Sequence, residues 1–299
     1  MEERDLDVAL GVCRNAFGTF LNVPDVSTFW QDKDFVRTRW RGKTGAAIVA
    51  ESNGVFAGSN VITKWGSFGF FGPLTTRPEL WGQGVAKALL GATMDVFDAW
   101  ATRDAGLFTF PHSVKHVGLY QKFGFHPRFL TAVLSKAPVA HGAWTGYSQL
   151  DAAGRSDALK ECGALADAVH DGLDLSAEIE SVFAQKLGET ILLRDSDRLD
   201  GFAVCHFGAG TEAGVGLCYV KFAIARNAQA FDRLLTAFES WAATIGASRI
   251  EVGVNAARVQ AYRAMFAHGY RSQMQGVAMQ KPNTPGFNRE DAWVLDDWR

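Results

Sequence analysis

The chain has 299 residues, of which 47% are hydrophobic and 21% are charged, and its formal net charge is −2. This length favours two domains over one. The near-neutral charge argues against a general nucleic-acid footprint, so we expect no nucleic-acid partner. Since no apolar run approaches the ~18 residues that a membrane span requires, we expect no membrane partner either.

Cysteine usage and the first residues bear on the compartment. The stretch Met1-Glu2-Glu3-Arg4-Asp5 is acidic and no apolar core follows it, so we expect no signal peptide. The cysteines are far apart in the sequence and none forms a Cys-x-x-Cys pair, so neither a zinc site nor a redox motif is indicated. We therefore expect a cytoplasmic protein with free thiols and no metal.

The first third of the chain predicts helices followed by strands. Apolar spacing favours a helix over Asp5–Phe20 and a second one over Phe29–Trp40. The turn residues Ser52-Asn53-Gly54 predict a hairpin between strands at Ala46–Glu51 and Val55–Thr63. The apolar run Phe68–Leu74 then predicts a buried strand.

A glycine loop and a helix follow this strand. The loop contains Gly82 and Gly84, and the helix stripe that we expect to face the core is Val85, Leu89, Ala92, Val96 and Trp100. Glycines at a helix start let a ligand approach the backbone closely, and the unpaired N–H groups suit a phosphate. A Rossmann fingerprint is broken by Lys87, and the Gly-Lys-Ser/Thr of a P-loop is absent. An ordinary strand–helix turn has the same local pattern.

Two motifs together resemble the GNAT acetyltransferases. Trp81-Gly82-Gln83-Gly84-Val85-Ala86 is similar to their pyrophosphate loop, Arg/Gln-x-x-Gly-x-Gly/Ala, although Trp81 stands where a basic or amide side chain is usual. Farther on, Leu119-Tyr120-Gln121-Lys122-Phe123-Gly124-Phe125 resembles their second signature, Leu-Tyr-x-Lys-x-Gly-Phe. The resemblance covers roughly residues 1–137.

The resemblance implies an α/β (α+β) fold, with a mixed, mostly antiparallel sheet flanked by helices. It also implies acetyl-CoA as the co-substrate, with pantetheine alongside Leu74, Thr75 and Thr76, and Tyr120 as the general acid that protonates the leaving thiolate. The other residues that it implies for coenzyme A binding are Trp81, Gly82, Gln83, Gly84, Val85, Ala86, Lys87, Ser113 and His116.

The acceptor and the general base stay open. The resemblance implies an amine acceptor, either a small molecule or a peptide, and His112 and His116 flank the expected cleft without either being evident as a base. A non-catalytic acyl-CoA-binding protein with an interaction or regulatory role is the alternative, favoured by Trp81, by Ser113 in place of the family's usual Asn, and by the missing base. Either a monomer or a homodimer is compatible with the sequence.

The first unit closes with strands expected at Leu107–Phe110 and Arg128–Leu134 and a helix at His116–Phe123. Residues 135–148 have no clear period, so we expect a domain boundary there. The elements predicted beyond it are helices at Asp151–Val169, Leu175–Leu187, Phe231–Ile245 and Arg258–His268 and strands at Thr190–Arg194, Leu199–Phe207, Gly216–Ala225 and Ile250–Val254.

The second half repeats the first at an offset of 145 residues: Leu89-Leu90 falls on Leu234-Leu235, and Gly124-Phe125 falls on Gly269-Tyr270. We therefore predict two tandem GNAT-like domains, a catalytic one over 1–137 and a degenerate one over 138–299. In this register the glycine loop falls on Asn227–Phe231 and Tyr120 falls on Met265, which cannot donate a proton. We also expect the aromatic and acidic tail, Phe287–Arg299, to be docked on the protein.

Overall fold

The computed structural model describes residues 1–30, 32–42 and 44–299. In the first half the helices are α1 (Leu6–Phe20), α2 (Phe35–Gly42), α3 (Val85–Ala99) and α4 (Val114–Gln121). The strands of this half are β1 (Gly45–Ser52), β2 (Val55–Trp65), β3 (Phe68–Phe71), β4 (Thr75–Thr76), β5 (Asp104–Thr109) and β6 (His126–Lys136).

The second half has the same kinds of elements in a similar order. Its helices are α5 (Ala152–Val169), α6 (Ser176–Gln185), α7 (Ala228–Thr244) and α8 (Val259–Ala267). Its strands are β7 (Gly188–Asp195), β8 (Arg198–Gly208), β9 (Gly214–Ala225), β10 (Arg249–Asn255), β11 (Arg271–Lys281) and β12 (Val294–Leu295).

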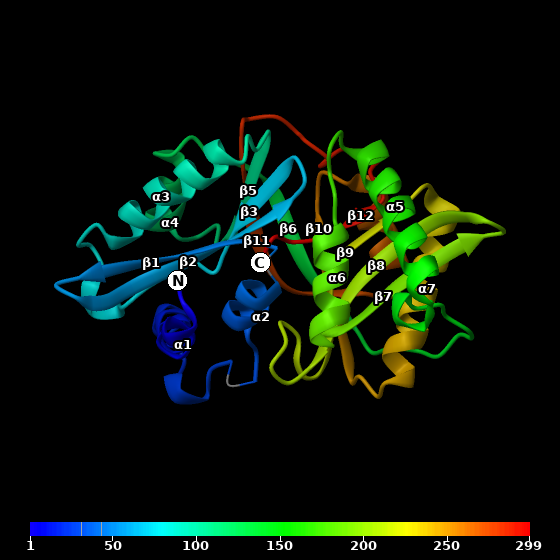
Figure 1. Cartoon of the computed structure of the whole chain (residues 1–299), viewed down its shortest axis with the longest axis horizontal. Coiled ribbons are helices and arrows are strands. Elements are labelled where there is room, and N and C mark those ends of the chain that lie inside the picture. Colours follow the sequence, from blue (N-terminus) through cyan, green and yellow to red (C-terminus); the bar gives the residue numbers. More distant parts are fainter. Residues whose placement is uncertain (31, 43) are drawn as a thin grey trace.

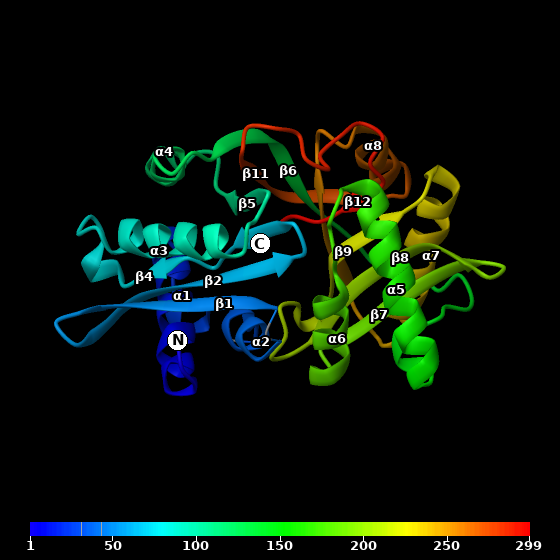
Figure 2. The same cartoon turned by 45° about the horizontal axis from the view of Figure 1, so that its top comes forward.

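Both halves contribute to one continuous mixed sheet, with the strand order β1-β2-β3-β5-β11-β6-β10-β9-β8-β7 among the described residues. Figure 1 shows β1 and β2 with α3 and α4 on one side of the molecule and β7 to β9 with α5 to α7 on the other. In Figure 2, α4 and α8 lie at corresponding places of the two halves. The mixed α/β class predicted from the sequence is confirmed.

The two halves exchange their last strands at the centre of the sheet. β11, from the second half, pairs with β5, whereas β6, from the first half, pairs with β10. The registers are equivalent, because Leu107 lies opposite Met279 and Leu134 lies opposite Val252, and the two pairs differ by 145 residues at each position. The same offset relates β6 to β11 from end to end. The centre of the sheet therefore has a local pseudo-twofold symmetry.

Turn and capping chemistry explains the β1–β2 hairpin and the start of α2. Asn53 and Gly54 have φ values of 53° and 74°, as a two-residue hairpin turn requires, and the predicted hairpin is confirmed. The predicted helix at Phe29–Trp40 begins only at Phe35, because the Asp34 carboxylate accepts a hydrogen bond from the Arg37 amide at 2.7 Å and so caps the helix there.

Two predictions for the glycine-loop region need correction. The predicted strand Phe68–Leu74 stops at Phe71, since Gly72 has a φ of 152° and Pro73 has no N–H to continue the ladder. The core-facing side of α3 is rotated relative to the expected stripe. Its buried side chains are Leu89, Leu90, Thr93 and Phe97.

Strand exchange predicts that the two halves unfold together. Leu134 on β6 is fully buried among side chains of the second half, so Leu134→Ala should lower the free energy of unfolding by about 2–5 kcal/mol. Leu130→Ala on the same strand, where the side chain is 42% exposed, should cost less than about 1 kcal/mol. Urea unfolding followed by circular dichroism and by tryptophan fluorescence should give coincident transitions. Two separate transitions, with only one shifted by Leu134→Ala, would contradict an interlocked sheet.

Candidate functional site

A split in the sheet forms the candidate site. β3 and β5 pair in parallel from Phe68 to Phe70, opposite Asp104 to Gly106, and the pairing stops there. The chain then turns through Gly72 into β4, which pairs with β2 alone among the described strands. β5 continues to Thr109 and is paired on its other side by β11. The strand edges of Leu74–Thr76 and of Leu107–Thr109 thus diverge, and an extended ligand can pair with the free edge of β4 as an added strand.

The tip of α3 is the second part of the site. Gly82 and Gly84 have φ values of 82° and 89°, which favour glycine, and a Cβ at either position would meet open space. Ala88 N donates to Gly84 O at 3.0 Å, but among the described residues no carbonyl accepts from the N–H groups of residues 85–87. Exposed helix-start N–H groups and the helix dipole together suit an anion such as a phosphate. Gln83 and Lys87 are exposed on this tip, and Val85 and Ala86 are half-buried.

Trp81 and Lys115 join the two sequence signatures in space. The Trp81 indole N–H donates to Thr76 O at 3.2 Å, which anchors the ring beside β4. The Lys115 Nζ, from the first turn of α4, lies 5.6 Å from the centre of this ring, a cation–π distance. An ammonium group is therefore held next to the glycine loop, in which Trp81 itself has no charge. Lys115 has no signal in the sequence, because 34 positions of unrelated sequence separate it from Trp81.

Tyr120 lies on α4 with its ring packed into the core behind the split. The side chain is 8% exposed, and its ring centre is 5.8 Å from that of Phe71, the last residue of β3. Burial raises the pKa of Tyr120 to about 12, so the phenol keeps its proton at any physiological pH. A protonated phenol at this place is suited to donate a proton rather than to accept one.

The remaining predicted residues lie at the start of α4. Ser113 is buried and stands at the N-cap position, although its side chain makes no capping bond. The His116 ring lies 4.8 Å from the Phe20 ring at the end of α1, and Phe110, at the end of β5, is 5.2 Å from Phe20. Burial lowers the pKa of His116, and the neighbouring Lys115 and His112 lower it further. A neutral imidazole at this place, on α4 beside Phe20, can accept a proton.

The corresponding places of the second half are filled by its own chain. The Asn227 side chain accepts from Ala230 N at 2.9 Å and so caps α7, where the first half has a glycine loop. Phe231 is fully buried against Trp293, with 5.1 Å between the ring centres. The tail then pairs with β9 as β12, and Asp297 packs on the backbone of Gly253 in β10. The tail thus lies between β9 and β10, where the first half has its open split.

Comparison with known proteins agrees with this geometry. Residues 18–125, within the first half, match the Acetyltransferase (GNAT) family. No curated protein matches the sequence. Over the whole chain the fold is similar to that of a Pyrococcus horikoshii protein provisionally described as an acetyltransferase, with 11% identity, a TM-score of 0.66, and coverage of 99% of this chain and 92% of that one. It is also similar to a GCN5-related N-acetyltransferase from Sphaerobacter thermophilus, with 14% identity, a TM-score of 0.57 and coverage of 94% and 93%.

The match and the open split define the class of the protein. The chain carries an acetyltransferase domain of the GNAT type in its first half, which makes it an acyltransferase. The sequence resemblance to this family is confirmed for that domain, and the similarity to the Pyrococcus and Sphaerobacter structures shows that the fold of the full chain is shared.

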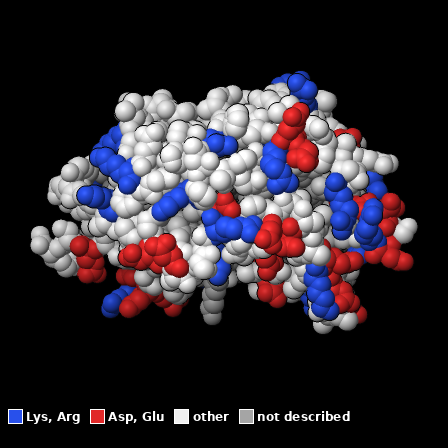
Figure 3. All heavy atoms as spheres, turned by 90° about the horizontal axis from the view of Figure 1, so that it is seen from above, with Lys and Arg blue, Asp and Glu red and all other residues white. Residues whose placement is uncertain are grey.

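Charged side chains of both signs are mixed on the surface. Figure 3 shows Lys and Arg scattered in small groups among neutral residues on one face, with acidic and basic side chains mixed toward its lower and right-hand parts. No helix in the described ranges is both long and apolar enough to cross a membrane. Nor do three or more His, Cys, Asp or Glu side chains of those ranges gather as metal ligands would.

Lys115 should contribute to acetyl-CoA binding. Lys115→Met removes the ammonium but keeps most of the stem over Trp81, so the KM for acetyl-CoA should rise about three- to tenfold, as expected for an exposed charge worth roughly 1 kcal/mol. The increase should shrink at high salt. Lys122→Met is the matched control, because Lys122 is an exposed lysine that follows the last turn of the same helix. Equal changes in KM for the two variants would show that the overall charge of the protein, rather than the position of Lys115, determines the KM for acetyl-CoA.

Proposed function

We propose that the chain is an N-acetyltransferase that moves an acetyl group from acetyl-CoA to an amine by direct attack. The observation that carries this proposal is the open split beside a helix tip with free N–H groups, within the segment that matches the acetyltransferase family. Pantetheine would pair with the edge of Leu74–Thr76, and the pyrophosphate would be bound by residues 82–87. Ser113 and His116 would line the same cofactor from α4.

The reaction needs no covalent enzyme intermediate. The acceptor nitrogen attacks the thioester carbonyl carbon, and a backbone N–H near Leu74 stabilises the oxyanion, a contribution often worth a few kcal/mol. The carbon–sulfur bond then breaks, and the departing thiolate takes the phenol proton of Tyr120. The amine loses its proton to solvent or to a neutral base, and His116 on α4, whose pKa is lowered by burial, is a candidate for that base.

We propose further that the chain consists of two tandem GNAT-like units, 1–137 and 138–299, of which only the first is catalytic. The shared offset of 145 residues between the starts of β5 and β10, of β6 and β11, and of α4 and α8 supports duplication. The Asn227 cap, buried Phe231 and the tail strand support loss of the second cofactor site. Small-molecule and peptide amines are both acceptable acceptors for the first site.

Tyr120→Phe tests the acid role. Thiol release from acetyl-CoA, followed with a panel of small amines and peptides, should fall by about 100-fold or more, since a general acid commonly contributes 10²–10⁴-fold. Coenzyme A affinity measured by calorimetry should change less than about threefold, because the ring remains packed against Phe71. Tyr262→Phe, in the second half, should leave both quantities unchanged. Coenzyme A binding without turnover on any acceptor would favour a non-catalytic acyl-CoA-binding protein.

The pH profile gives an independent test. Tyr120 acts in its protonated form, and burial raises its pKa to about 12, so the active form stays populated well above the usual range of a phenol. The alkaline limb of kcat should therefore show no fall with a pKa near 10. A fall with a pKa near 10 that is absent from Tyr120→Phe would show that the phenol is solvated and that the buried position is wrong.

A further inference from the structure

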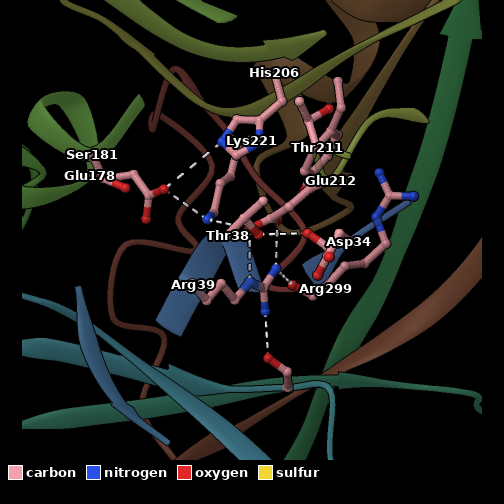
Figure 4. Close-up of polar contacts among 12 residues, drawn as sticks. Asp34, Thr38, Arg39, Glu178, Ser181, His206, Thr211, Glu212, Lys221 and Arg299 are labelled. Atoms are coloured by element: carbon pink, nitrogen blue, oxygen red, sulfur yellow. Dashed lines mark hydrogen bonds and ion pairs between the residues drawn. The ribbon is translucent and has the colours of Figure 1, made fainter. Parts of the chain in front are cut away.

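A buried network of charges connects the two halves behind the split. Arg39, on α2, forms a two-pronged ion pair with Glu212, in the β8–β9 connection, at 2.9 and 2.7 Å. Lys221, on β9, donates to Glu212 and to Glu178 of α6, each at 2.8 Å. The four residues are at most 3% exposed. Figure 4 shows them as one chain of contacts from Glu178 through Lys221 and Glu212 to Arg39.

The network is electrically balanced, with two positive and two negative groups. Burial alone would raise the pKa of Glu212, but Arg39 and Lys221 outweigh that effect and hold its pKa well below the usual range. Such a network is a poor source of net stability, because removing four charges from water costs about as much as their attraction returns. Net stability therefore does not explain why these four charged side chains are buried together.

Arg39 also reaches the point at which the sheet divides. Its Nη1 donates to the Gly72 carbonyl at 2.5 Å, while Gly72 N donates to Val61 O at 2.8 Å. The guanidinium lies over the Phe35 and Phe70 rings, at 5.3 and 5.6 Å from their centres. The peptide at Gly72 is thus held on its carbonyl side by a guanidinium that donates to the Glu212 carboxylate and also to the Arg299 carbonyl.

We propose that Glu212 is a positioning residue supplied by the second half to the acyl-transfer site of the first. Through Arg39 it fixes the Gly72 carbonyl, and so sets the direction in which Leu74–Thr76 leaves β3. This inference rests on the proposed function, since Leu74–Thr76 is the edge on which the thioester would be bound. It also gives the second unit a role in catalysis although its own cofactor site is filled.

Glu178 offers a matched comparison within the same network. It is as buried as Glu212 and shares Lys221 with it, and it also accepts from the Trp65 indole at 3.3 Å. Among the described residues, however, no hydrogen bond or ion pair joins Glu178 to Arg39 or to Gly72, and Glu178 acts on Arg39 only through its charge. Loss of either carboxylate disturbs the charge balance, but only loss of Glu212 removes the two-pronged contact that orients the guanidinium and leaves it with the Gly72 and Arg299 carbonyls.

Three variants distinguish the positioning of Gly72 from the charge balance of the network: Glu212→Gln, Arg39→Lys and Glu178→Gln. Arg39→Lys keeps the charge but cannot span Glu212 and Gly72 with a rigid fork. At a temperature well below each Tm, Glu212→Gln and Arg39→Lys should lower kcat by about 10- to 100-fold, as expected for a small misplacement of reacting groups. The KM for acetyl-CoA should change much less. Glu178→Gln should lower Tm and leave kcat within about twofold of the parent chain.

Hydrogen exchange keeps the test independent of turnover. Amides of residues 74–76 should exchange at least several-fold faster in Arg39→Lys and Glu212→Gln than in Glu178→Gln. An equal loss of kcat in all three variants, or unchanged exchange at residues 74–76, would overturn the positioning role. If the parent chain transfers no acetyl group but exchange still rises selectively, the proposed reaction fails while the mechanical link stands. If Glu212→Gln does not fold, Arg39→Lys alone decides both measurements.

Discussion

The end of backbone pairing between β3 and β5 is the constraint on which the rest of the structure depends. Beyond Phe70 and Gly106 the two strands no longer share hydrogen bonds, although each remains paired on its outer side. A sheet interior normally leaves no polar backbone unpaired, so the polar groups of an open edge are satisfied by a ligand, by another segment or by ordered water. The first half leaves its edge open beside a helix tip whose first N–H groups have no carbonyl partner among the described residues. The second half closes the corresponding edge with the tail strand β12. The two halves therefore differ in whether this edge is open or covered.

The residues that surround the first edge come from distant parts of the chain. α3 provides the free N–H groups, α4 provides Lys115 and Tyr120, and the second half reaches the division point through Arg39. Packing against Phe71 keeps Tyr120 in a poorly hydrated place, which explains its raised pKa. The site is therefore built from backbone geometry and desolvation more than from a cluster of reactive side chains.

Local chemistry explains what the sequence alone could predict. The Asn53-Gly54 turn, the glycines at positive φ and the helical apolar spacing are properties of short stretches, and so are the two acetyltransferase signatures. The offset of 145 residues was also visible, because the corresponding elements of the two halves have similar lengths and spacings. Strand exchange was not predictable, since β6 and β11 are equivalent strands, and either could in principle fill either place. The Arg39–Glu212 pair, 173 residues apart, left no local pattern at all.

The exchange of β6 and β11 also bears on how the sequences of the two halves could become different. A homodimer of one such unit could form a similar twofold centre. Every substitution would then occur in both subunits, so their two sites would stay identical. Fusion into one polypeptide fixes a one-to-one stoichiometry and lets each copy change alone. One half can then keep an open split between its strands, while the other half closes the corresponding place with the tail strand.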